Sequence, residues 1–298
     1  MKKLMMVGLM LTAAIALQAQ LKVAPKMEKG TVKTYVGQTT ITIPAQGDVK
    51  VSDETKYTVV DATADGYIID MQSVDVKTEC DASNIAGKLV AASQEIVKGI
   101  TFRIAVDKDG KVQRLLNGDE VQPKLSECTD AFIDQLLKDI PQLASMLSKD
   151  DLKKQMADAI TPEAMLQTIQ EATSPFALNG KTITTGAQED YVSKDGLKMR
   201  RMYFVQGQNI VANSTLNMTK DEMKEMIIKQ VEKSAPDQAA MVKENIDQLM
   251  STGMLKMDMK ETATYELQAD GWVKSIKNET TTETMGQQLV TKSTATLK

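Results

Sequence analysis

Residues Phe102 to Val112 read Phe-Arg-Ile-Ala-Val-Asp-Lys-Asp-Gly-Lys-Val, and this stretch decides the fold. Phe102, Ile104 and Val106 alternate with charged or small residues, which is the pattern of a strand with one apolar and one solvated face. The Asp109-Gly110 pair then favours a tight turn, because both central residues of such a turn need positive φ, which Asp tolerates and Gly accepts freely. The stretch therefore predicts an antiparallel β-hairpin.

The same turn signal recurs at Asp65-Gly66, Asp195-Gly196 and Asp270-Gly271, so the sequence indicates four hairpins. Alternating or β-branched stretches lie on both sides of these turns. They are residues 31–43, 56–62, 67–77, 181–191, 198–217 and 255–261. The threonine-rich segment 280–298 has strand propensity with weak alternation, and we expect it to form edge strands.

Two blocks of helical periodicity interrupt the strands. The first block ends in a helix that Thr161 should cap and Pro162 should begin. The second block starts with the capping-box pair Thr219 and Glu222, and Gly253 should end it. We therefore expect an α+β fold: a curved antiparallel β-sheet, half-barrel-like and built from hairpins, with two inserted helical blocks packed on one face.

The first residues have the pattern of a secretory signal peptide. Lys2-Lys3 precede a mostly apolar run from Leu4 to Leu17, and Ala19-Gln20 provides the small residue expected at a cleavage site. The run is too short to span a bilayer comfortably and no comparable run follows, so we expect no transmembrane anchor. No cysteine near the cleavage position offers a site for a bacterial lipid anchor. We expect an exported protein, periplasmic or extracellular.

The chain is expected to comprise a signal peptide at 1–19 and a single α+β domain at 20–298, because no Pro-, Gly- or Ser-rich linker divides it. Strands and helices should alternate in blocks along this domain. The expected blocks are strands at about 31–118, helices at about 129–173, strands at about 181–217, helices at about 220–252 and strands at about 255–298.

The composition excludes several classes of function. The 298 residues contain no histidine, which removes histidine-dependent hydrolase triads and histidine-ligated zinc sites. Only 4% of residues are aromatic, which argues against a sugar-binding surface of stacked rings. A net charge of -4 provides no field that attracts nucleic acid. No nucleophile motif, phosphate loop or complete calcium loop occurs, so we assign no catalytic residue, metal or cofactor, and a non-enzymatic role is favoured over a carboxylate-only enzyme.

Cys80 and Cys128 are the two cysteines of the chain. In an oxidising compartment an even number favours a disulfide, so we expect these two residues to be bridged. The alternative is two unpaired, buried thiols. A catalytic pair is disfavoured, because the spacing is not Cys-x-x-Cys.

The chain contains 20 methionines, and many of them fall on expected helix faces. Flexible thioether side chains line surfaces that adapt to variable apolar ligands. Methionines at helical spacing also fill ordinary cores, which is the alternative interpretation. The candidate ligand-binding residues are Met156, Met165, Met223, Met226 and Ile227.

Three features together resemble the secreted envelope proteins of unknown function that are common in Bacteroidota. They are a signal that ends in Ala-Gln, a hairpin at 104–112 followed by helices, and a Pro175-Phe176 segment leading into paired strands up to Tyr191. More distantly, the layout is similar to the periplasmic lipoprotein carriers, whose curved antiparallel sheet holds acyl chains beneath covering helices. No ligand-contact motif of the carriers can be matched here, so the resemblance implies architecture only.

We therefore expect an exported envelope protein that binds an apolar or acylated ligand between sheet and helices, with a lipid or an acylated protein as partner. The alternative is a non-catalytic structural or protein-interaction module with a solid core. A continuous methionine-lined cavity would favour the first hypothesis, and a fully packed interface between sheet and helices would favour the second. The sequence does not indicate the oligomeric state.

Overall fold

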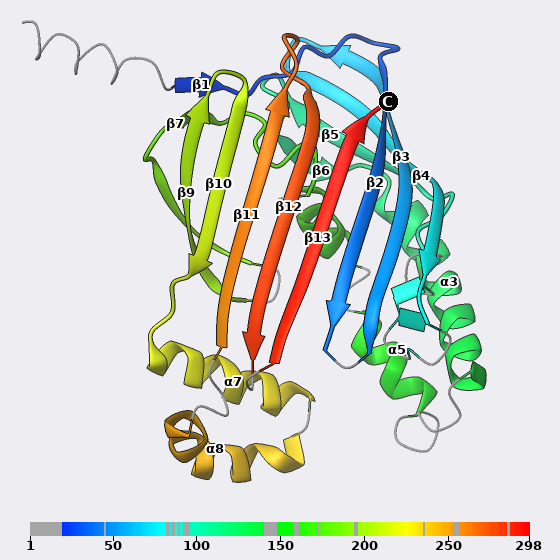
Figure 1. Cartoon of the computed structure of the whole chain (residues 1–298). Coiled ribbons are helices and arrows are strands. Elements are labelled where there is room, and N and C mark those ends of the chain that lie inside the picture. Colours follow the sequence, from blue (N-terminus) through cyan, green and yellow to red (C-terminus); the bar gives the residue numbers. More distant parts are fainter. Residues whose placement is uncertain are drawn as a thin grey trace, which may run out of the picture.

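The computed structural model describes residues 20–44, 46–81, 84, 87–88, 90–91, 96–139, 148–157, 161–171, 173–193, 196–234, 236–252, 257–284 and 287–298. The expected signal peptide at 1–19 lies outside these ranges. Most of the described chain forms one large antiparallel sheet of 11 strands, shown in Figure 1. The predicted α+β class with a curved antiparallel sheet is confirmed.

The large sheet has the strand order β6-β5-β4-β3-β2-β13-β12-β11-β10-β9-β8 and does not close on itself. Its strands are β2 (Val32–Ile43), β3 (Gly47–Thr63), β4 (Gly66–Glu79), β5 (Thr101–Asp107), β6 (Val112–Leu115), β8 (Gln188–Val192), β9 (Lys198–Gln206), β10 (Asn209–Leu216), β11 (Met257–Leu267), β12 (Val273–Thr284) and β13 (Gln287–Leu297). A separate two-stranded sheet pairs β1 (Gln20–Lys22) with β7 (Thr182–Thr184).

The four predicted Asp-Gly turns all connect hairpin strands. They join β3 to β4, β5 to β6, β8 to β9 and β11 to β12, although Asp195 itself lies outside the described residues. At the β5–β6 turn the Asp107 carboxylate accepts hydrogen bonds from the backbone amides of Asp109 (3.0 Å) and Lys111 (2.9 Å). This carboxylate therefore stabilises the turn that the sequence predicts.

The prediction of edge strands for the segment 280–298 is wrong. β13 lies in the middle of the sheet, where it pairs with β12 on one side and with β2 on the other. The first long strand and the last strand of the chain are thus neighbours, which makes the two halves of the chain one continuous sheet (Figure 1). Apolar and polar residues alternate only weakly in this segment because its inward-facing residues are polar in one part of the sheet.

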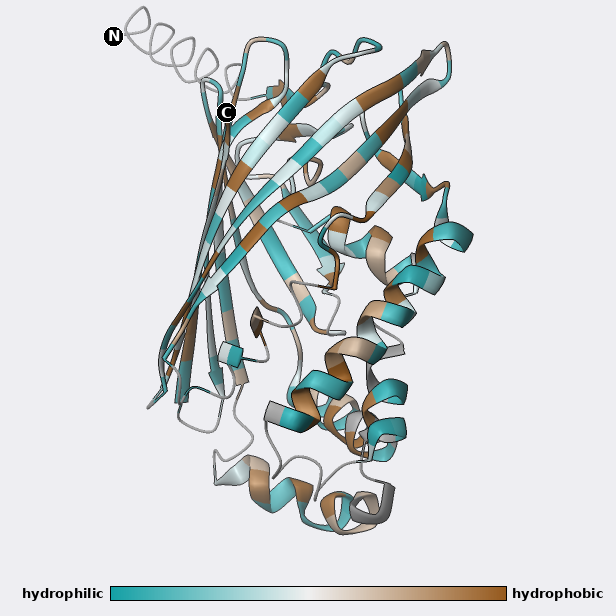
Figure 2. Ribbon diagram, turned by 90° about the vertical axis from the view of Figure 1, so that its right-hand side faces the viewer, coloured by the Kyte–Doolittle hydropathy of each residue, from teal (hydrophilic) through white to brown (hydrophobic). Residues whose placement is uncertain are grey.

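The helices form two groups. The first comprises α3 (Gly118–Asp139), α5 (Lys149–Ala157) and α6 (Pro162–Ile169), and Figure 2 shows it on one side of the sheet. The second comprises α7 (Lys220–Ser234) and α8 (Pro236–Ser251), which pack on each other at the end of the sheet, below β10 to β13 in Figure 1. The second group therefore covers the strand ends.

The two predicted N-terminal helix caps are present, whereas Gly253, the predicted end of the second helical block, lies outside the described residues. The Thr161 hydroxyl accepts a hydrogen bond from the Ala164 amide at 3.2 Å, and Pro162 begins α6. The Glu222 amide donates to the Thr219 hydroxyl at 3.2 Å, while the Glu222 carboxylate accepts from the Thr219 amide at 2.8 Å. α3 begins at Gly118, earlier than predicted, because acidic residues in its first turn favour the helix dipole and Pro123 is accommodated inside it.

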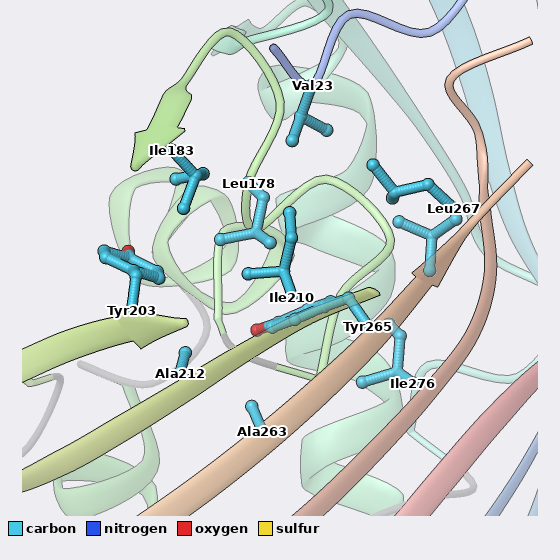
Figure 3. Close-up of a cluster of buried hydrophobic side chains, with 11 residues drawn as sticks. Val23, Leu178, Ile183, Tyr203, Ile210, Ala212, Ala263, Tyr265, Leu267 and Ile276 are labelled. Carbon is cyan, nitrogen blue, oxygen red and sulfur yellow. The ribbon is translucent and has the colours of Figure 1, made fainter. Parts of the chain in front are cut away.

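Three apolar clusters hold these elements together. The first packs the strands β9 to β12 against the segment 177–183 and Val23, as Figure 3 shows. The second packs β2 to β6 against α6, Phe176 and Trp272. The third packs α3 and α5 against the start of β5. All three clusters lie on the same face of the sheet, the one that the first helical group covers, and we call it the inner face.

The expected disulfide between Cys80 and Cys128 is wrong, because both cysteines are free thiols. Cys80 follows the end of β4, where a Cβ atom added to Gly87 would lie 2.6 Å from its own Cβ. Cys128 packs from α3 against the third cluster. Each thiol is half-buried among its own neighbours, which corresponds to the alternative of two unpaired cysteines.

Candidate functional site

A row of polar residues crosses the inner face at matching register positions. From the edge inward, each member pairs with the next on the neighbouring strand, so six strands contribute one residue each. We call this set the polar row: Glu189, Arg201, Ser214, Glu261, Thr280 and Thr291. Polar side chains on the covered face of a sheet are unusual, because burial without partners is costly.

Arg201 is the centre of the polar row. Its side chain is 10% exposed. Its guanidinium donates to the Ser214 hydroxyl at 3.0 Å and lies 3.4 Å from a Glu189 oxygen and 3.6 Å from a Glu261 oxygen. The ring of Tyr191 covers the guanidinium at 4.2 Å. Two carboxylates, a hydroxyl and an aromatic face therefore compensate one buried cation.

Glu189 joins the polar row to the first cluster. Lys181 lies 2.9 Å from both of its oxygens, and the Tyr203 hydroxyl donates to it at 2.5 Å. Burial alone would raise the pKa of Glu189, but hydrogen bonds from Tyr203 and Lys181, together with the charges of Lys181 and Arg201, lower it overall. Burial and the hydrogen bond to Glu189 raise the pKa of Tyr203, so its hydroxyl is a donor at neutral pH.

Asn278 extends the polar set one step along β12. The residue is 8% exposed, and its Nδ2 donates to a Glu261 oxygen at 3.2 Å. The other Glu261 oxygen accepts from the Tyr191 hydroxyl at 3.3 Å. In the described part of the chain, the Asn278 Oδ1 atom is buried and accepts no hydrogen bond. This carbonyl oxygen is thus an unused acceptor on the inner face.

Towards the end that carries α7, four strands of the inner face carry apolar residues. Ile41 pairs with Thr291 of the polar row, and the others lie beyond that row, with the polar Thr282 of β12 between Met259 and Leu289. The residues concerned alternate with outward-facing ones on β2, β10, β11 and β13 and belong to none of the three core clusters. We call this set the apolar strip: Ile41, Leu216, Met257, Met259 and Leu289. Its members are half-buried, except Leu289, which is 38% exposed. Apolar surface therefore stays accessible on the covered side of the sheet.

A groove of about 490 Å³ lies where the edge strand β8 and the start of β9 meet the start of α7. Tyr191 and Met199 form part of its wall, together with Met218 and the capping residues Thr219 and Glu222. Since Tyr191 also covers Arg201, one side chain separates this groove from the polar row.

The structure places the predicted ligand-binding residues on two separate helical groups. Met165 of α6 packs against the third cluster. On α7, Met223 is buried, with 8% exposure, while Met226 and Ile227 are half-buried. Met156 belongs to α5, and its side chain lies outside the described part of the structure. Met223, Met226 and Ile227 are therefore the candidates that lie at the same end of the sheet as the apolar strip.

Sequence reasoning missed the polar row, although the alternation contains its signal. Arg201 alternates with buried Met199 and Tyr203, and Asn278 follows buried Ile276 at the same spacing. A strand with period two places such residues on one face. A charged or amide side chain at an inward position of a predicted strand is therefore the sequence signature of this row.

No group of three or more histidine, cysteine or acidic residues in the described part of the chain could hold a metal ion. None of the described helices is both long and apolar enough to cross a membrane.

Comparisons with known proteins give only distant likenesses. No family model matches the chain, and no curated protein matches it. A structure of lipovitellin, titled for its lipid-protein interactions, aligns with a TM-score of 0.39 and 9% identity over 91% of this chain and 25% of lipovitellin. A porin-like protein from Bacteroides uniformis aligns with a TM-score of 0.19 and 10% identity over 91% of this chain and 97% of that one. This chain thus spans a quarter of lipovitellin, and neither score supports a functional argument.

Proposed function

We propose that this protein is an exported binding protein that holds an apolar or acylated ligand between the inner face of the sheet and the helices. The apolar strip is the observation that carries the proposal. Its side chains lie on the covered side of the sheet, yet they remain partly exposed and outside the core clusters. Covering apolar surface is favourable by about 25 cal/mol per Å², so an alkyl chain gains free energy by lying on this strip.

The position of α7 supports the same proposal. This helix follows the end of β10, where Leu216 contributes to the apolar strip, and it lies at the end of the sheet in Figure 1. Half-buried Met226 and Ile227 give it an apolar surface that can adapt to a ligand. In this proposal α7 forms a wall of the site and the apolar strip forms its floor.

The proposal is tested with N-phenyl-1-naphthylamine, a neutral apolar probe whose emission rises on transfer from water. The parent protein should bind the probe saturably. Leu289→Glu should weaken binding at least about tenfold, because an ionised carboxylate is costly to bury beside an apolar ligand. Fluorescence titration of the two proteins measures the effect.

Gln288→Glu is the matched control, because Gln288 is the preceding residue of the same strand, is exposed, and points to the opposite face. It adds the same charge without touching the apolar strip, so probe binding should stay at the parent level. Equal affinities of the two variants, or no saturable binding by the parent, would exclude a ligand site on the strip and leave the interaction module with a solid core.

A further inference from the structure

We infer that the polar end of the ligand is an uncharged hydrogen-bond donor, an amide N–H or a hydroxyl, which Asn278 recognises through Oδ1. This inference rests on the proposed ligand site and specifies the chemistry of its ligand. Asn278 Oδ1, on β12, is the acceptor that carries it. The hydrogen bond from Nδ2 to Glu261 fixes the orientation of the amide group, so Oδ1 is the atom left without a donor in the described part of the chain.

None of the described residues around Asn278 places a donor within hydrogen-bonding reach of Oδ1. Its register partner on β11 is Ala263, whose side chain has no polar atom. Its partner on β13 is Ser293, which is half-buried, as is the next inward residue of β12, Thr280. A buried acceptor without a partner costs about 1 to 3 kcal/mol. A ligand that displaces the half-buried hydroxyl side chains beside Asn278 therefore gains a hydrogen bond that the free protein lacks.

The charges nearby disfavour an anionic ligand. Arg201 and Lys181 are the cations of this region, and both are already paired with carboxylates, Arg201 with Glu189 and Glu261, and Lys181 with Glu189. A carboxylate or phosphate head group would have to break these ion pairs and would approach Glu261. An uncharged donor keeps every ion pair intact and meets two acceptors, the Asn278 oxygen and the Glu261 carboxylate.

The polar row and the apolar strip together define an amphiphile. The alternating residues of β11 run from Met257 and Met259 in the strip to Glu261 in the polar row. β12 pairs antiparallel with β11, and Asn278 lies one inward position beyond Thr280, the partner of Glu261. An alkyl chain on the strip therefore directs its head group towards the polar row and Asn278.

Three ligands with the same alkyl chain test separately the effects of an N–H donor, of the amide group and of a negative charge. They are decanamide, which has N–H donors, N,N-dimethyldecanamide, which keeps the amide but has none, and decanoate, which carries a negative charge. Each is measured by displacement of N-phenyl-1-naphthylamine from the parent protein. Decanamide should bind about tenfold more tightly than the dimethylated amide, and decanoate should bind more weakly than decanamide.

The variant Asn278→Leu tests whether Asn278 causes the preference for decanamide over the dimethylated amide. In this variant the ratio of the two amide affinities should fall to about one, because the acceptor is gone. The ratio is measured within one protein, so a general change in stability does not alter it. Asn213→Leu is the matched control: Asn213 lies on β10 opposite Thr262 and points to the outer face, so the ratio should stay at the parent value.

The outcomes distinguish this inference from the proposed function. Equal binding of all three ligands would overturn the donor inference and leave the apolar site in place. Tightest binding of decanoate would overturn it as well, and would show that an ion pair opens for an anion. A ratio that Asn278→Leu leaves unchanged would overturn the assignment of the donor contact to Asn278. Absence of binding by all three ligands and by the probe would refute both proposals.

Discussion

Replacing Arg201 by methionine is expected to lower the free energy of unfolding by about 3 to 5 kcal/mol, because it removes the cation paired with the buried Glu261 carboxylate. The Arg201 side chain is 10% exposed and the Glu261 side chain 12% exposed, so water screens this charge pair little. Methionine preserves the volume of the arginine stem and removes its charge. Urea unfolding followed by far-UV circular dichroism measures the difference from the parent.

Arg200→Met is the matched control. Arg200 is the preceding residue on β9 and also forms an ion pair, with Asp190 at 2.8 Å, but it lies on the outer face with 48% of its side chain exposed. Exposed pairs contribute little to stability, so this variant should unfold close to the parent. Equal destabilisation by the two substitutions would contradict the central role of the buried pair.

The effect of Arg201→Met should also depend on pH. The pKa of Glu189 is lowered in the folded protein, so the stability gained from its partners is present above the pKa of the unfolded chain. That stability is lost as the pH falls through the lowered folded pKa, where the carboxylate becomes protonated. The difference between parent and variant should therefore be largest at neutral pH and should shrink in acid.

Trp272→Ala is expected to destabilise the protein by about 3 to 5 kcal/mol, because it removes the largest fully buried side chain. The indole contacts the Phe176 ring edge-to-face, with ring centroids 6.2 Å apart. The Phe176 ring in turn contacts the Tyr57 ring, with centroids 5.3 Å apart. The indole Nε1 donates to the Lys26 carbonyl at 2.9 Å. One side chain thus ties the β11–β12 hairpin to the N-terminal segment and to β3.

Trp272→Phe serves as the control, since it keeps a ring in the cluster and loses the hydrogen bond to Lys26. Its cost should be clearly smaller than that of alanine. Chemical unfolding, monitored by circular dichroism because the only tryptophan is replaced, gives both values. A small cost for Trp272→Ala would mean that the second cluster does not connect these segments.

Most of the architecture could be predicted from local sequence signals. The Asp-Gly pairs correctly located the hairpins. The capping residues Thr161 and Thr219 form hydrogen bonds at the starts of the helices that they predict. These features depend on residues that are neighbours in the chain. The order of the strands does not, because the pairing of β13 with β2 joins opposite ends of the sequence.

The candidate site could not be assembled from the sequence for the same reason. Glu189, Arg201, Glu261 and Asn278 lie on four strands, and only the register of the sheet aligns them. In the sequence, each of these residues taken alone has the character of a solvent-exposed surface residue. The methionine pattern indicated apolar helix faces, but it did not separate Met165, which packs into the core, from half-buried Met226.

Photo-cross-linking with a neutral alkyl amide that carries a terminal diazirine tests the proposed ligand site most directly. After irradiation, peptide mass spectrometry identifies the labelled residues. We expect saturable labelling of the apolar strip, on the peptides that contain Met259 and Leu289, and its suppression by excess decanamide. Labelling confined to exposed outer residues such as Phe204 and Val192, or labelling that does not saturate, would contradict a ligand held between sheet and helices.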